Sequence, residues 1–103
     1  MPIIVATVLP KPEDREAVKE ALLAAAPLVH EEKGCHLYAM HENDDRFVVI
    51  ESWESLEDMG THASGDAFTT MSAALKDKLT APLDVVVLDA LPAGDPAKGA
   101  LPA

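Results

Sequence analysis

Residues 34–55 read GCHLYAMHENDDRFVVIESWES, and this stretch decides the fold of the chain. It holds two strand-like runs, residues 35–41 and 46–53, on either side of the turn-forming cluster of residues 42–45. The stretch therefore predicts a β-hairpin. Side chains alternate between the two faces of a strand, so both faces of the second arm are mostly apolar. One face carries Phe47, Val49, Glu51 and Trp53, and the other carries Val48, Ile50 and Ser52.

Before the hairpin, the pattern predicts a strand and a helix. Residues 3–9, IIVATVL, form an apolar run rich in β-branched side chains, which is typical of a strand buried on both faces. Acidic residues followed by apolar residues at helical spacing predict a helix over residues 12–32. Pro27 lacks the N–H that an interior helical position needs, so we expect the helix to kink or restart there. Gly34 is expected to end this helix in the left-handed conformation.

After the hairpin, the pattern predicts two more helical segments and a strand. Ser55 is a favourable N-cap for a short helix that runs to about His62. A further helix is expected over residues 64–79 and a last strand over residues 83–91. Residues 92–103 have the composition of a flexible tail, which we expect the partner subunit of a dimer to hold.

The order of these elements is βαββαβ, with the second helix broken in two, and it defines an α+β fold class. It is the pattern of a ferredoxin-like domain, in which a four-stranded antiparallel sheet carries the helices on one face. Residues 1–91 then form one domain and residues 92–103 a C-terminal tail. Nothing within one chain covers the second apolar face of this sheet, so we expect a homodimer.

The composition limits the classes of partner. Lys and Arg total 8 against 18 Asp and Glu, which gives a net charge of -10. Such a surface repels phosphate backbones and anionic lipid headgroups, so neither nucleic acid nor a membrane is an expected partner. No apolar stretch approaches the roughly 20 residues that span a bilayer, and we expect a cytoplasmic protein. Cys35, the single cysteine, has no partner for an internal disulfide and no metal-site spacing.

The hairpin and the segment after it resemble the antibiotic biosynthesis monooxygenase domain. The motifs that carry the resemblance are Gly34-Cys35 followed by Tyr38 and His41, the strand end Glu51-x-Trp53-x-Ser55, His62 nine residues after the tryptophan, and Phe68. The resemblance covers about residues 3–90 and implies a dimeric α/β barrel, with a pocket between sheet and helices in each subunit. Members of the family include cofactor-independent oxygenases of quinols and hydroxyanthrones, haem-degrading oxygenases and an isomerase of a phosphorylated sugar. Fold alone therefore does not decide the function.

The resemblance also implies a site. His41 and His62 match histidines that often line the family's pocket, and Trp53 matches its pocket tryptophan, whose N–H we expect to bond a substrate oxygen. Glu51 shares the strand face of Trp53, so its carboxyl is expected in the pocket as well. An imidazole can take a phenolic proton, and the resulting anion can pass an electron to O₂ with no cofactor or metal. The predicted catalytic residues are His62, His41, Trp53 and Glu51, and the predicted pocket-lining residues are Tyr38, Phe68 and Met71.

The register of the hairpin stays open at this point. An odd-numbered loop would place Cys35, Leu37, Ala39 and His41 on the face of Trp53, and an even-numbered loop would place His36, Tyr38 and Met40 there. We favour the arrangement that turns His41 toward the pocket, because the small side chains before it leave room beneath the helices.

The chain departs from the family pattern at two places. Ala67 stands where many relatives have a second histidine, directly before the position of Phe68, so a proton relay built on that histidine is absent. Haem-degrading relatives use an asparagine on the first strand, where this chain has Ala6 or Thr7, so haem is not expected.

The favoured function is a cofactor-independent monooxygenase that oxidises a small quinol-like or polycyclic aromatic substrate with O₂. Two alternatives belong to other classes of protein. One is an isomerase or another proton-transfer enzyme that uses the same pocket. The other is a non-catalytic dimer that binds a small ligand or has a stress-related role.

Overall fold

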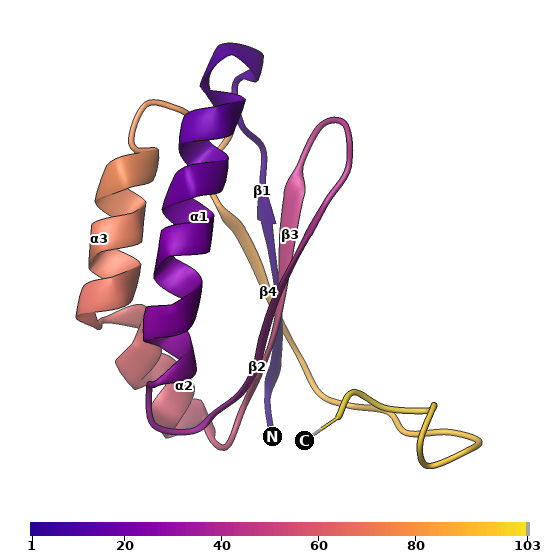
Figure 1. The fold of residues 1–103 in the computed structure, drawn as a ribbon. Helices are drawn as coiled ribbons and strands as arrows, with labels where there is room; N and C mark the ends of the chain where they lie inside the picture. Colours follow the sequence, from indigo (N-terminus) through magenta and orange to yellow (C-terminus); the bar gives the residue numbers. More distant parts are fainter. Residues whose placement is uncertain (103) are drawn as a thin grey trace.

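The computed structural model describes residues 1–102, and a four-stranded antiparallel sheet organises its fold (Figure 1). The strands are β1 (Ile3–Val8), β2 (Cys35–Glu42), β3 (Phe47–Trp53) and β4 (Asp84–Leu88). Their order across the sheet is β2-β3-β1-β4, so β1 lies between β3 and β4. The two arms of the hairpin, β2 and β3, pair directly as the sequence predicted.

The helices all lie on one face of the sheet (Figure 1). They are the short 3-10 helix η1 (Pro12–Asp14) and the α-helices α1 (Arg15–His30), α2 (Leu56–Ala63) and α3 (Asp66–Leu75). This arrangement confirms the α+β, ferredoxin-like fold class. No helix among residues 1–102 is long and apolar enough to cross a membrane.

The first helix does not restart at Pro27, which was one of the two outcomes expected there. Helix α1 runs through Pro27 without a restart, because this residue is exposed and its neighbours Ala25 and Val29 are buried against the core. The carbonyl of Leu23, which loses its helical donor, lies on the same exposed side, where water can satisfy it. The helix ends at His30, and Gly34 follows with a φ of 82° in the turn that leads into β2. A Cβ at Gly34 would collide with the side chain of Asp58, so glycine is required there for two reasons.

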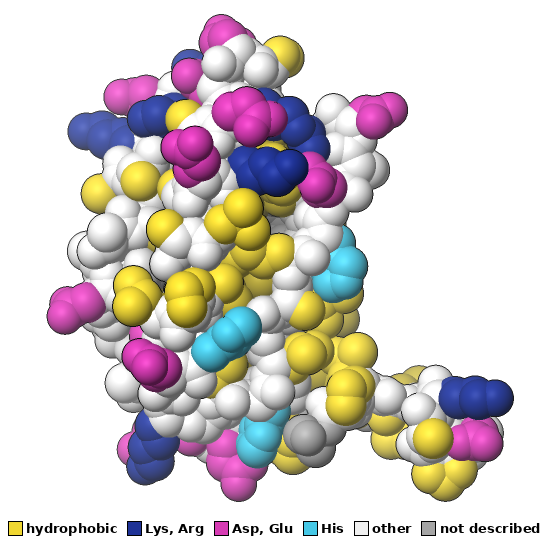
Figure 2. Space-filling view, viewed as in Figure 1, with side chains coloured by type: hydrophobic (Ala, Val, Ile, Leu, Met, Phe, Trp, Pro, Cys, Tyr) yellow, Lys and Arg dark blue, Asp and Glu magenta, His cyan; other side chains and the backbone are white. Residues whose placement is uncertain are grey.

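The last helix and strand are shorter than predicted. Helix α3 stops at Leu75 because Lys76 turns to an extended conformation and Asp77 adopts a φ of 64°. Strand β4 stops at Leu88, the last residue that pairs with β1. The chain beyond β4 extends away from the domain (Figures 1 and 2). The last residue of the predicted tail, Ala103, lies outside the described residues.

The register of the hairpin places Tyr38 opposite Glu51 and Met40 opposite Val49. Cross-strand partners share a face, so Tyr38 and Met40 point toward the helices with the buried face of β3. The expectation that His41 shares the face of Trp53 is wrong, because His41 pairs with Val48 on the opposite face. The loop of residues 43–46 is even-numbered, and a register shift between Cys35 and Leu37 leaves Cys35, in place of His36, opposite Trp53.

The core lies between the sheet and the helices, in two adjoining clusters. One cluster joins α1 and α3 to the ends of β1 and β3, and includes Val8, Leu22 and Phe47. The other surrounds Trp53, which is fully buried. Between them and the edge strand β4, the packing leaves a cavity.

Candidate functional site

A cavity of about 170 Å³ lies between the sheet and helices α2 and α3. Its walls come from all four strands and from all three α-helices. Polar side chains enter it at Tyr38, Glu51 and His62, and the remaining walls are apolar. The other lining residues are Ile4, Ala6, Val8, Leu22, Val49, Met59, Gly60, Ala63, Phe68, Met71, Leu83, Val85 and Val87. An apolar hollow with a few convergent polar groups is typical of a small-molecule site.

The position of His62 follows from the way α2 begins. Ser55 is in an extended conformation, and its Oγ accepts a hydrogen bond from the backbone N–H of Asp58 at 3.0 Å. This N-cap starts α2 directly after β3, as the sequence predicted. His62 then falls in the last turn of α2, on the side that faces the sheet, and it is the buried residue of that helix.

Aromatic side chains hold the imidazole of His62 in place. Its ring stacks on that of Trp53, with a centroid distance of 4.6 Å and an interplanar angle of 28°. The rings of Tyr38 and Phe68 meet it edge-on, each at a centroid distance of 5.8 Å. The imidazole is therefore oriented by apolar packing on several sides.

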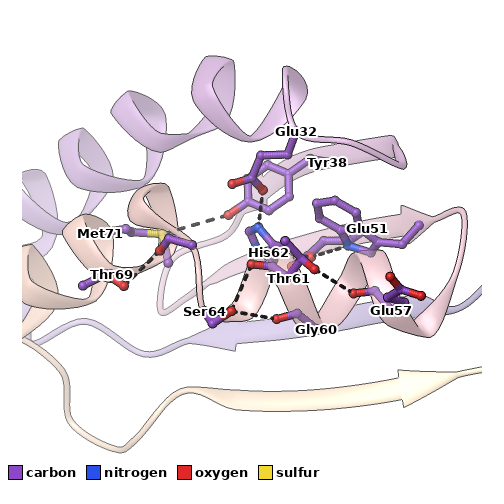
Figure 3. Close-up of polar contacts among 12 residues, drawn as sticks. Glu32, Tyr38, Glu51, Glu57, Gly60, Thr61, His62, Ser64, Thr69 and Met71 are labelled. Atoms are coloured by element: carbon purple, nitrogen blue, oxygen red, sulfur yellow. Dashed lines mark hydrogen bonds and ion pairs between the residues drawn. The ribbon is translucent and has the colours of Figure 1, made fainter.

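The two nitrogens of His62 face two different carboxyl groups. Nδ1 lies 2.6 Å from Oε1 of Glu32, and Nε2 lies 3.8 Å from Oε1 of Glu51 (Figure 3). A carboxylate oxygen accepts hydrogen bonds, so Nδ1 is assigned as the donor to Glu32. With this bond formed, Nε2 is the ring nitrogen that faces Glu51.

Burial raises the pKa of the Glu51 carboxyl above its usual range. The N–H of Trp53, which donates to Oε1 of Glu51 at 2.9 Å, and the nearby His62 lower this pKa again, while Glu32 raises it. The balance is a buried carboxyl that holds its proton more tightly than an exposed one. A raised pKa makes the ionised form of this carboxyl a stronger base.

The hydroxyl of Tyr38 is held only weakly. It donates to the thioether sulfur of Met71 at 4.0 Å, and sulfur is a poor acceptor. Burial raises the pKa of this phenol, and the neighbouring carboxyls of Glu51 and Glu32 raise it further. Tyr38 therefore stays neutral and can offer its O–H to a ligand in the cavity.

The structure divides the predicted site residues. His62, Glu51, Tyr38, Phe68 and Met71 all line the cavity. Trp53 does not line the cavity, and its N–H is already bonded to Glu51, which corrects the expectation that it bonds a substrate oxygen. His41 is exposed on the opposite face of the sheet.

Sequence reasoning missed Glu32. It lies in the turn after α1, and its contact with His62 joins residues 30 positions apart in the chain. No motif or residue spacing in the sequence indicates such a contact.

The carboxyls around His62 do not form a metal site. Glu32 and Glu51 approach different nitrogens of the ring, and these point in different directions, so the groups do not converge on one point. Among residues 1–102 no group of three histidine, cysteine or carboxylate side chains is arranged to hold a metal ion.

The fold and the cavity define a class of protein: a ferredoxin-like domain with an apolar cavity that ends in an imidazole between two carboxyl groups. The particular family follows from the sequence, because the family model described as antibiotic biosynthesis monooxygenase matches residues 1–74. The chain belongs to this family. Among curated proteins, none matches the chain by sequence.

Solved structures share the whole fold. The Rv0793 protein of Mycobacterium tuberculosis is 26% identical, with a TM-score of 0.84 over 92% of this chain and 100% of that one. A candidate antibiotic biosynthesis monooxygenase from Deinococcus radiodurans is 27% identical, with a TM-score of 0.82 over 92% and 97% of the two chains. The PA3566 protein of Pseudomonas aeruginosa is 24% identical, with a TM-score of 0.81 over 87% and 93%, and this likeness shows the fold alone.

Proposed function

We propose that this protein is a cofactor-independent monooxygenase that oxidises a small quinol-like aromatic compound with O₂. The observation that carries the proposal is the placement of Glu51 and His62 at the polar part of an otherwise apolar cavity. Such a pair can remove a phenolic proton, and the apolar walls can hold an aromatic ring and O₂ away from water. Membership of the monooxygenase family supports this choice of chemistry.

The cavity favours a substrate with one ring. An apolar cavity of about 150 Å³ is known to hold benzene, and this one has about 170 Å³. Two carboxyl groups flank His62, and the chain carries a net charge of -10, so an anionic substrate would be repelled. We therefore favour an uncharged hydroquinone over a polycyclic or acidic phenol.

In the proposed reaction, the ionised carboxylate of Glu51 takes the phenolic proton of the substrate. Glu51 can then pass this proton to His62. The phenolate passes an electron to O₂, and the two radicals combine at a ring carbon. One oxygen atom stays on the ring, and the other leaves as water. Hydroquinone and O₂ thus give hydroxyquinone and water, and the substrate supplies all the electrons. Tyr38 can donate its O–H to the oxygen that becomes negative.

Oxygen uptake with a series of hydroquinones tests the proposal. Labelled O₂ should leave one labelled atom in the quinone and one in water, whereas a simple oxidase would form labelled hydrogen peroxide. Glu51→Gln should lower turnover by about 100-fold, the scale of general-base catalysis. His36→Asn is the matched control, because His36 is exposed and pairs with Glu54 away from the cavity. Unchanged turnover in Glu51→Gln would exclude Glu51 as the base.

A proton-transfer enzyme is the second candidate, and the same pair of groups favours it. Glu51 and His62 could move a proton between two carbons of a carbonyl compound without any redox step. Exchange of substrate hydrogen with deuterated water, with no oxygen uptake, would identify this activity. A ligand that raises the melting temperature without turnover would instead indicate a binding protein.

A further inference from the structure

We propose that Glu32 is a positioning residue that forms the outer end of a proton relay, which runs from the cavity through Glu51 and His62 to solvent. This inference rests on the proposed function, since it concerns the proton that the substrate loses. It assigns a role to a residue that no sequence motif singled out.

The three groups lie in a row of proton donors and acceptors, with one hydrogen bond formed and one longer gap. Oε1 of Glu51 lies 3.8 Å from Nε2 of His62, and Nδ1 of His62 lies 2.6 Å from Oε1 of Glu32. The second distance is already a short hydrogen bond between an imidazole and a carboxylate. The first must close to about 2.6–3.2 Å for transfer, which a side-chain movement of Glu51 in the cavity can supply.

Solvent exposure increases from Glu51 and His62 to Glu32, which is the direction that a relay to solvent needs. The side chains of Glu51 and His62 are each 6% exposed, whereas that of Glu32 is 24% exposed. A proton that reaches Glu32 can therefore pass to water, whereas one held on Glu51 remains in the buried site. Glu32 connects the closed part of the site to solvent.

The other titratable groups around the relay do not offer a competing path. Burial, followed by the charges of Glu51 and Glu32, raises the pKa values of both Cys35 and Tyr38, so both stay protonated. His30 bonds the backbone oxygen of Tyr38 with its ring nitrogen and makes no contact with His62 or Glu32 among the hydrogen bonds of residues 1–102. Within residues 1–102, the two carboxyls are the only charged side chains at ion-pair distance from the ring nitrogens of His62.

The carboxyl of Glu32 lies near the start of helix α3 as well as near His62. Its Oε2 lies close to Gly65, where an added Cβ would stand 3.4 Å from this oxygen. Gly65 is the N-cap of the ten-residue helix α3, and the positive end of a helix dipole favours a negative charge. Glu32 thus sits between the partial positive charge of α3 and the Nδ1–H of His62.

The proposed transfer moves protons only. The substrate hydroxyl gives its proton to Glu51, which passes it to Nε2 of His62, while the proton on Nδ1 moves to Glu32. Glu32 then releases its proton to water. The oxygen atom that leaves as water needs a proton later in the same turnover, and delivery through the same atoms in reverse order, from Glu32 through His62 and Glu51, returns the ring to its first tautomer. The ring gains one proton at Nε2 and loses one at Nδ1, so the net charge of His62 does not change.

Kinetics of position 32 variants test the relay. Glu32→Gln keeps an oxygen that can accept from Nδ1 but cannot take up the proton, and Glu32→Ala removes both properties. We expect kcat to fall by about 10- to 100-fold in both variants, with KM little changed. Acetate added to Glu32→Ala should restore part of the lost kcat, because it can reach the exposed end of the relay. Glu31→Gln, an exposed neighbour in the same turn, is the control and should keep full activity.

A nitrogen NMR measurement on His62 tests the same contact without any substrate. The wild-type ring should show a protonated Nδ1 and an unprotonated Nε2 when neutral, and Glu32→Ala should shift the ring toward the other tautomer. An unchanged tautomer in Glu32→Ala, or no rescue by acetate, would overturn the role of Glu32. Absence of oxygen uptake in the wild-type protein would instead refute the proposed function, and the tautomer would still report on Glu32.

Discussion

Glu51 couples the stability of this fold to pH. Because burial raises its pKa, the folded chain binds this proton more tightly than the unfolded chain. The stability that follows is fully present below the ordinary carboxyl pKa and is lost as the pH rises through the raised value. The variant Glu51→Gln has no carboxyl at this position, so it does not lose stability in this way as the pH rises. Its amide oxygen can still accept a hydrogen bond from the N–H of Trp53.

We therefore expect Glu51→Gln to gain stability relative to the wild type as the pH rises from about 4 toward neutrality. Urea denaturation at a series of pH values measures this difference. Glu57→Gln, an exposed change on α2, should leave the pH dependence as it is. If the unfolding free energies of the wild type and Glu51→Gln change in parallel with pH, the assignment of a raised pKa to this carboxyl is contradicted.

Trp53 acts on the site through Glu51. Its N–H donates to Oε1 of Glu51, which lowers the pKa of that carboxyl against the effect of burial. Trp53→Phe should therefore raise this pKa and move the acidic limb of the pH–activity profile to higher pH. Loss of a hydrogen bond to a charged group should also destabilise the fold by about 1.5–3 kcal/mol. A pH–activity profile that falls in height without moving along the pH axis would contradict an effect of Trp53 on the pKa of Glu51.

At the level of elements, the N-cap of α2 places the imidazole. Ser55→Ala removes the bond to the N–H of Asp58 and should lower the unfolding free energy by about 1 kcal/mol. Because His62 is in the last turn of this helix, fraying at its start should also loosen the stack on Trp53. Thermal unfolding measures the first effect, with Thr70→Ala on the exposed side of α3 as the control. Equal losses in both variants would show that the cap contributes nothing specific.

For the whole molecule, the uncovered face of the sheet is the dominant feature. Val86 and Leu88 of β4 are 42% and 45% exposed, and their register partners on β1 continue the same apolar face toward Ile50. A continuous apolar sheet face of this kind is covered in stable proteins. We propose that a second copy of the chain covers it, as the sequence analysis expected.

Sedimentation should then show two chains per particle at micromolar concentration. Ile50→Asp should raise the dissociation constant by roughly 100-fold or more, because an unpaired charge in an interface costs several kcal/mol. Leu23→Asp, on the exposed side of α1, is the control and should leave the dimer intact. A wild-type protein that sediments as a monomer would rule out the proposal that a second copy covers this face of the sheet.

Local pattern was sufficient for the order of the elements. The alternation along β3 placed Phe47, Val49, Glu51 and Trp53 on one face, and all four are buried. The Ser55 cap and the apolar spacing located α2 and the start of α3. These features depend on neighbours within a few residues, so a single sequence contains them.

The tertiary structure alone decided the polar arrangement of the cavity. The even-numbered loop of residues 43–46 turned Tyr38 inward and His41 outward, although the residue types allow either register. The contact of Glu32 with His62 follows from packing α1 and α2 against the same end of the sheet. Such contacts depend on the distances between side chains that are remote in the chain, and hydrophobic periodicity reports only which face each element buries.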